Sequence, residues 1–223
     1  MTTSDVILLK AISVAEACPG RWWTPTAELL ASIEPGRTQV KVLAIEPDSD
    51  GGAELWDACA VWLAVEDRNA GELSGTIVRT SLDRDGTRAG DSLATPVDRV
   101  FDIVSFGPDD RPLLNEQRAR FAVGKRALVG ITVLSSDEEL LERHQFVGTI
   151  ADADPDHGIR LLLDDGSDYW LPPDSRCLEE ARPGEYRLHS NGQTVVDPDY
   201  VCTWTITRPD HRQSMPNDGY HAA

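Results

Sequence analysis

The chain is poor in positive charge. It carries 21 Lys and Arg residues against 38 Asp and Glu residues, for a formal net charge of −17. Acidic residues exceed basic ones both before and after position 107, so the acidity is not confined to a tail. A negative field of this kind repels nucleic acid phosphates and anionic membranes. The composition therefore predicts no nucleic acid or membrane partner. It favours a basic protein partner, unless the acidity serves only solubility.

Cysteine is scarce, and no two of the four cysteines form a C-x-x-C pair. Zinc ribbons and thioredoxin-like redox motifs are therefore not expected. Cys59 and Cys202 lie in apolar runs, as small core residues do. The N-terminal segment lacks the basic region of a secretory signal, and no apolar run reaches membrane-spanning length. These features predict a cytoplasmic protein with reduced thiols.

Motifs that cradle phosphates or ligate metals are also missing. The chain has neither G-x-x-x-x-G-K-[ST] nor G-x-G-x-x-G, so no binding site for nucleotide phosphates is expected. The histidines are scattered, and none has a second His or Cys at metal-ligand spacing on a helix. We therefore expect no cofactor, no metal and no catalytic residue.

Residues 1–107 predict a small α+β domain. Thr24 is a plausible N-cap and Pro25 fits the first helical position, so a helix is expected to run up to Pro35. Residues 4–18 fit either a short helix or a strand. Stretches rich in strand formers follow at 37–45, 55–67, 72–78 and 92–104. Separated by turns, they predict an antiparallel meander of four or five strands.

Residues 108–124 contain two prolines and mixed charge, and they predict a linker with a short helix at "LLNEQRARF". Residues 125–207 predict a second domain, a small antiparallel barrel or strongly bent sheet, in which Asn191-Gly192 forms a hairpin turn. Residues 208–223 predict a frayed tail. No long helices alternate with the strands, so the fold class is β-rich α+β rather than parallel α/β.

The stretch "IADADPDHGIRLLLDDGSDYWLPPD" raises the question of a metal site. Asp152, Asp154 and Asp156 stand at positions 1, 3 and 5 of an EF-hand loop. The loop requires Gly at position 6 and Glu at position 12, where this chain has His157 and Leu163. The stretch therefore predicts two turns, "DADPDHG" and "DDGS", in which Asp and Gly suit the tight backbone.

A hydrolase is the alternative from another functional class. Gly90 to Leu93 spells G-D-S-L around Ser92, and Asp154 and His157 have the D-x-x-H spacing of that esterase family. A nucleophilic serine needs such a carboxylate-oriented base. However, the motif follows a polar loop rather than a buried strand. Of the four cysteines, Cys177 lies in the most loop-like stretch of sequence, and it would be the nucleophile of a cysteine hydrolase. A third alternative is a small ligand bound between the two halves.

Two pairs of adjacent aromatic residues suggest exposed anchors. Trp22 and Trp23 precede the first helix, and Tyr169 and Trp170 point to opposite faces of one strand. One member of each pair is expected to be partly exposed. Such aromatics beside carboxylates suit a protein-binding patch, and they equally suit a lid over the rim of a small core. The candidate partner-binding residues are Trp22, Trp23, Asp164, Asp165, Asp168 and Trp170.

Two segments resemble bacterial domain families. Residues 21–104, with Trp56 and a proline-capped helix, resemble an uncharacterised small α+β domain, but depart from it at Arg37 (Asp in the family) and Leu55 (Met in the family). Residues 121–207, with "QFVG", "LPPD", "PGEY" and "DPDY", resemble a bacterial β-barrel domain, and the resemblance implies an SH3-like β-barrel.

Such domains occur in genes thought to encode immunity proteins for bacterial toxins, and in genes of unknown role. The resemblance implies a two-domain, non-catalytic protein. In its most specific form, this would be an immunity protein that neutralises a basic toxin through an acidic face. The motif residues are implied to be structural, and the resemblance carries over no catalytic residue.

Overall fold

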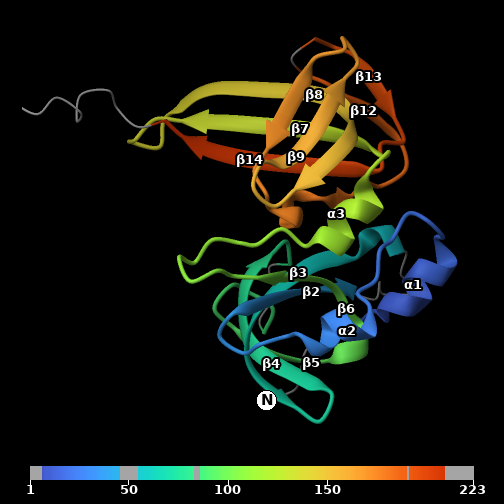
Figure 1. Ribbon diagram of the computed structural model, residues 1–223, viewed down its shortest axis with the longest axis vertical. Coiled ribbons are helices and arrows are strands. Elements are labelled where there is room, and N and C mark those ends of the chain that lie inside the picture. The colour runs from blue at the N-terminus through green and yellow to red at the C-terminus, as the bar shows by residue number, and fades with distance from the viewer. Residues whose placement is uncertain (1–6, 46–54, 83–85, 190, 209–223) are drawn as a thin grey trace, which may run out of the picture.

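The computed structural model describes residues 7–45, 55–82, 86–189 and 191–208 (Figure 1). Within this part of the chain, strands form two six-stranded sheets and a separate two-stranded hairpin, and the few helices are short. The expected β-rich α+β class is therefore confirmed. No helix among the described residues has the length and apolar character needed to cross a membrane.

The first half combines short helices with the first sheet. Its elements are β1 (Ile7–Leu8), α1 (Ala11–Ala17), α2 (Ala27–Ala31), β2 (Thr38–Ile45), η1 (Leu55–Asp57), β3 (Cys59–Asn69), β4 (Glu72–Thr80), β5 (Ser92–Pro96), η2 (Val97–Arg99) and β6 (Val100–Ser105). Strands β2 to β5 form the expected antiparallel meander, and β6 returns to pair with β2. The stretch predicted as one strand at 92–104 is interrupted after Pro96, where a 3-10 turn redirects the chain.

The start of α2 differs from the prediction. Its N-cap is Thr26 rather than Thr24, because the Thr26 hydroxyl accepts a hydrogen bond from the Leu29 N–H at 3.3 Å. Pro25 therefore precedes the cap instead of opening the helix. The apolar side of this short helix, with Leu29 and Leu30, packs on the core beneath the first sheet.

The second half follows a short helix. Its elements are α3 (Glu116–Ala122), β7 (Arg126–Leu134), β8 (Leu140–Asp154), β9 (Gly158–Leu163), β10 (Asp168–Leu171), η3 (Ser175–Cys177), β11 (Glu179–Glu180), β12 (Glu185–Arg187), β13 (Thr194–Val196) and β14 (Tyr200–Thr207). Their sheet is strongly curved and nearly barrel-shaped, and it lies above the first sheet in Figure 1. The hairpin β12–β13 covers part of its outer surface through Leu188 and Val195.

One pairing departs from the expected antiparallel barrel. The order is β10-β9-β8-β7-β14-β11, and β14 runs parallel to β7 from Tyr200 to Thr207. The chain leaves β10 through η3, β11 and the β12–β13 hairpin before it enters β14. Such a long connection allows β14 to lie parallel to β7, which a tight hairpin cannot do.

The segment predicted as a linker packs into the core of the second half and is hydrogen-bonded to the first half. It contains the expected short helix, α3, and its residues Leu114, Ala119 and Ala122 pack in the core of the second half. Asn115 caps α3 by accepting from the Arg118 N–H, and its amide nitrogen donates to the Ile103 carbonyl in the first half at 3.0 Å. This segment therefore ties the two sheets together.

Both turns predicted in the aspartate-rich stretch are present. Asp154 Oδ1 closes the β8–β9 turn by accepting from the backbone N–H groups of Asp156 and His157. Asp165 Oδ1 accepts from the Ser167 N–H in the β9–β10 turn. Gly158 is required on two counts, because its φ is +102° and a Cβ would lie 1.9 Å from the Leu171 carbonyl oxygen.

We therefore expect Gly158→Ala to lower the free energy of unfolding by at least about 3 kcal/mol, since the new methyl group adds a clash to backbone strain. Gly166→Ala is the matched control. Gly166 also has a positive φ, +83°, but a Cβ there meets no atom within 4 Å. Its expected cost is only about 1 kcal/mol. Urea unfolding measures both values, and equal losses would contradict the role given to the Leu171 contact.

Candidate functional site

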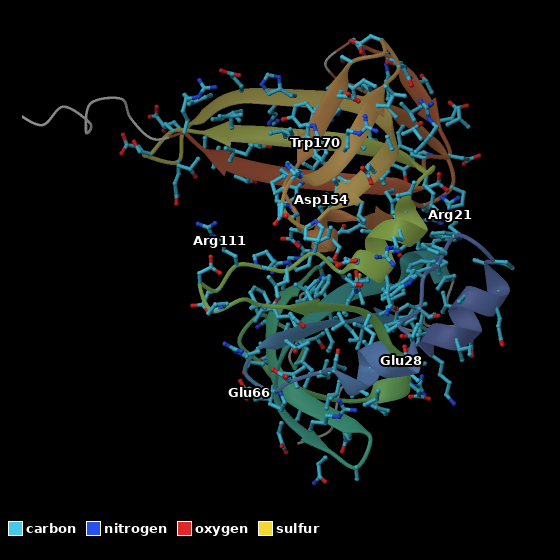
Figure 2. The ribbon with its side chains drawn as sticks, viewed as in Figure 1. Arg21, Glu28, Glu66, Arg111, Asp154 and Trp170 are labelled. Atoms are coloured by element: carbon cyan, nitrogen blue, oxygen red, sulfur yellow. The ribbon has the colours of Figure 1, made fainter. Side chains whose placement is uncertain are left out.

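Trp170 lies on the outer surface of the second sheet. Side chains alternate along β9 and β10, so Leu161 and Tyr169 point into the core while Leu162 and Trp170 point outward. Trp170 is 44% exposed and Leu162 is 45% exposed. Tyr169 packs against Phe146 with ring centroids 4.6 Å apart. The predicted opposite orientation of Tyr169 and Trp170 is thus confirmed, and Figure 2 shows Trp170 and Asp154 on the second half.

The residues around Trp170 form one surface across three strands. In the register of the sheet, Arg160 lies between Asp152 on β8 and Trp170 on β10, and Leu162 pairs with Asp168. We call this surface the Trp170 face and define it as Asp152, Arg160, Leu162, Asp168 and Trp170, with the flanking turns at 154–157 and 164–165. Of the sequence-predicted candidates, Asp168 and Trp170 lie on this face, whereas Asp164 and Asp165 lie in the β9–β10 turn, at the end of the hairpin away from Trp170.

The charge on the Trp170 face is strongly negative. The face and its two turns contain six aspartates, and Arg126 and Arg160 are the basic residues paired with them. Arg126 binds Asp164 at 3.0 Å, and Arg160 lies 3.4 Å from Asp168. Within the described residues, Asp152 and Asp156 have no basic partner. Excess negative charge thus surrounds the exposed Trp170 and Leu162 side chains.

The turn beside Trp170 is held in a defined geometry. Asp154 Oδ1 is 2.8 Å from His157 Nδ1, and this contact, together with two backbone N–H donors, holds the pKa of Asp154 below its ordinary value. The His157 ring lies 5.9 Å from the Trp170 ring, centroid to centroid. The turn and the strand pairing therefore fix the backbone on both sides of the exposed indole, which limits the backbone entropy lost when a partner binds.

The prediction that one of Trp22 and Trp23 is exposed is wrong. Both are 7% exposed, because the irregular segment before α2 lets adjacent side chains enter different packing environments. Trp22 packs against Trp56 and Phe101, with ring centroids 5.8 and 5.9 Å away. Trp23 lies against the Arg118 guanidinium at 5.9 Å. Neither tryptophan can serve as a partner-binding anchor in this conformation.

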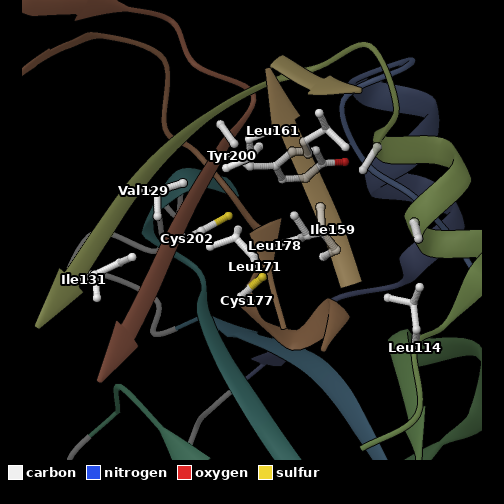
Figure 3. Close-up of a cluster of buried hydrophobic side chains, with 14 of the residues drawn as sticks. Leu114, Val129, Ile131, Ile159, Leu161, Leu171, Cys177, Leu178, Tyr200 and Cys202 are labelled. Atoms are coloured by element: carbon white, nitrogen blue, oxygen red, sulfur yellow. The ribbon is translucent and has the colours of Figure 1, made fainter. Parts of the chain in front are cut away.

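The hydrolase candidates are not arranged for catalysis. Ser92 is exposed at the start of β5 in the first sheet, whereas Asp154 and His157 lie in a turn of the second sheet. Cys177 is buried in the core of the second half together with Cys202 (Figure 3). Its contact with Cys202 and its burial raise the pKa of the Cys177 thiol well above its ordinary value, which suppresses the reactive thiolate.

Comparison with known proteins leaves the role open. No protein family, curated protein sequence or solved structure was found to match the chain. The resemblance to the two bacterial domain families thus stays a prediction, and the function is inferred from the side chains themselves.

The junction of the two halves contains a buried charge cluster that the sequence analysis missed. Arg118 on α3 binds Glu180 at 2.5 Å and lies 3.5 Å from Asp102 on β6. Lys41 on β2 binds the other oxygen of Glu180 at 3.1 Å. The side chains of these four residues are at most 4% exposed. We call them the junction cluster, and it links β2 and β6 of the first half to α3 and β11 of the second.

Further hydrogen bonds complete the surroundings of Arg118. Its guanidinium donates to the Leu178 carbonyl at 2.9 Å and to the Tyr200 hydroxyl at 3.2 Å. Burial alone would lower the pKa of Arg118, but Glu180, Tyr200 and Asp102 together outweigh burial and raise that pKa. Burial raises the pKa of Asp102 above its ordinary value although Arg118 and Lys41 oppose the shift. We therefore assign the junction cluster a structural role, which is to fix the two sheets against each other.

The pKa of Glu180 gives this role a pH dependence. Burial alone would raise that pKa, but Arg118 and Lys41 outweigh burial and hold it below the ordinary value of 4.5. A depressed pKa in the folded state means that ionised Glu180 stabilises the fold above pH 4.5. This contribution is lost as the pH falls through the folded-state pKa.

We expect Glu180→Gln to destabilise the protein at neutral pH, and we expect the difference from wild type to shrink as the pH falls below 4.5. Urea unfolding between neutral and acidic pH tests this. Glu179→Gln is the control, because the neighbouring Glu179 side chain is 54% exposed. A difference that stays constant or widens on acidification would contradict the assignment.

Proposed function

We propose that this protein binds a basic protein partner through the Trp170 face and inhibits it, as an immunity protein inhibits a bacterial toxin. The observation that carries the proposal is the position of Trp170 and Leu162. Both are exposed on the outer surface of the β9–β10 hairpin at the edge of the second sheet, and six aspartates lie on this surface and its two flanking turns. The proposal places the protein in the cytoplasm, where such an inhibitor would protect the cell that makes it.

The composition of the Trp170 face matches what a protein interface needs. Buried tryptophans are among the side chains that contribute most to binding energy at interfaces. Charged residues around such an anchor mainly raise the rate of encounter and select partners of opposite charge. Trp170 supplies the anchor, and the aspartates of the two turns supply the charge.

The scaffold also suits an inhibitor. Trp170 and Leu162 project from regular strands, so their backbone is held by the β8–β9–β10 hydrogen bonds. Inhibition by occupation of a partner's surface requires no catalytic group. It requires a preformed surface whose ordering costs little free energy on binding.

The proposal is tested by capturing the partner with the full-length protein from a lysate of the organism that carries the gene. Three baits are compared at low and high salt: wild type, the double variant Leu162→Ser with Trp170→Ala, and the control Val78→Ser. Val78 is 42% exposed but lies on β4 in the first half. Quantitative mass spectrometry then ranks the captured proteins.

The expected result is a protein rich in Lys and Arg that is enriched by wild type and by Val78→Ser but is lost with the double variant. High salt should reduce its capture, because screening weakens attraction between exposed charges. If the same proteins are captured by all three baits, or if the protein lost with the double variant is acidic, the Trp170 face is not the binding surface proposed.

A further inference from the structure

A cleft of about 370 Å³ opens where β11 of the second half meets the first sheet. Its apolar side is formed by Trp22, Leu43, Ala58 and Ala60. The two alanines leave space that larger side chains would fill. The volume lies in the range of small-molecule sites, which occur preferentially between domains.

The base and rim of the cleft are polar. Lys41 and Glu180, both members of the junction cluster, form its base through a buried ion pair of 3.1 Å. Arg79 and Glu179 lie on its rim, where a 2.9 Å ion pair joins the two halves. A second ion pair between the halves, Arg182 to Asp57 at 3.3 Å, lies next in the chain to the wall residue Ala58. These links hold the two walls of the cleft in place.

The two basic residues of this cleft have donor groups that the contacts with Glu179 and Glu180 do not use. Lys41 Nζ has three N–H groups, and within the described residues it donates to Glu180 Oε2 alone. Arg79 donates to Glu179 through Nη2, and its guanidinium carries further N–H groups. Glu180 already accepts from both Lys41 and Arg118, and Glu179 accepts from Arg79. A ligand that fits must therefore supply acceptors.

We propose that this cleft binds a small carboxylate with a compact apolar body. The carboxylate would accept from Lys41 at the base and from Arg79 at the rim, where it can share or replace the contact with Glu179. The apolar body would pack against Trp22, Leu43 and the two alanines. A matching amine would have to compete with Arg79 for Glu179 and with Lys41 and Arg118 for Glu180, and the like charge of these residues disfavours it. This site is separate from the Trp170 face and does not depend on the proposed function.

Ligand-observed and protein-observed NMR test the proposal on the full chain. The probes are benzoate, phenylacetate and 4-methylpentanoate, each paired with the amine of the same skeleton. The reporter is the indole N–H signal of Trp22, assigned with Trp22→Phe. Ala60→Leu fills the cleft without changing its charge, and Ala94→Leu on the exposed edge strand β5 is the matched control. Both variants place a larger apolar side chain on a strand.

We expect at least one carboxylate to bind about tenfold more tightly than its amine and to shift the Trp22 signal. Ala60→Leu should weaken that binding about tenfold or more, and Ala94→Leu should leave it unchanged. The proposal is overturned if no carboxylate binds at millimolar concentration, if amines bind equally well, or if Ala60→Leu binds like wild type. If Ala60→Leu does not fold, Ala58→Leu replaces it with the same expected loss of binding.

Discussion

Replacing Arg118 with methionine is expected to lower the free energy of unfolding by about 3–5 kcal/mol. The Arg118 side chain is 1% exposed and contacts Asp102 and Glu180, whose side chains are also almost fully buried. Without the guanidinium, Lys41 alone must balance two buried carboxylates. An uncompensated charge in the protein interior is strongly destabilising. The Leu178 carbonyl and the Tyr200 hydroxyl also lose a donor.

Arg120→Met is the matched control for this prediction. Arg120 lies on the same helix, but its side chain is 77% exposed and pairs only with Glu116 one turn away. Its loss should cost about 0.5 kcal/mol or less. Urea unfolding of both variants decides the question. Similar, small losses for Arg118→Met and Arg120→Met would show that the junction cluster does not hold the two halves together.

Replacing Trp170 with alanine is expected to weaken binding of the captured basic partner by about 2 kcal/mol or more, which is roughly a thirtyfold increase in Kd. The fold should hardly be affected, because the indole is already 44% exposed.

The neighbouring residue Tyr169 provides the opposite test. The Tyr169 ring packs against Phe146 in the core, so Tyr169→Ala should lower the free energy of unfolding by about 3 kcal/mol.

Calorimetric titration and urea unfolding of these two variants separate binding from stability. The proposal fails if Trp170→Ala binds as tightly as wild type. It fails equally if Trp170→Ala loses as much stability as Tyr169→Ala, since that would make Trp170 a core residue rather than an anchor.

Local patterns predicted the strands well because side-chain alternation and turn chemistry are local. The alternation in "DYWL" placed Tyr169 and Trp170 on opposite faces, and the Asp-Gly turns appeared where they were expected. The alternation of side-chain direction along a strand, applied to "GIRLLL", would also have identified Leu162 as exposed. The continuous apolar run concealed it, because three leucines in succession resemble a strand buried on both faces.

Features that depend on distant contacts were not predictable. The parallel pairing of β14 with β7 joins segments about seventy residues apart, and no local pattern encodes it. Trp22 and Trp23 are both buried because an irregular segment, unlike a strand, does not force them to opposite sides. Arg118 lies in "NEQRARF", where it resembles the exposed Arg120, and only Asp102 and Glu180 distinguish the two.

The central claim is that an acidic sheet face draws in a basic partner, and the rate of association tests it most directly. Stopped-flow mixing with the captured partner would be measured from low salt to about 1 M, where the Debye length falls to about 3 Å. The claim predicts that the association rate constant falls by roughly tenfold or more over this range. It also predicts a lower rate at low salt for the combined variant Asp164→Asn, Asp165→Asn and Asp168→Asn. An association rate that does not depend on salt, and is the same for that variant, would contradict the claim.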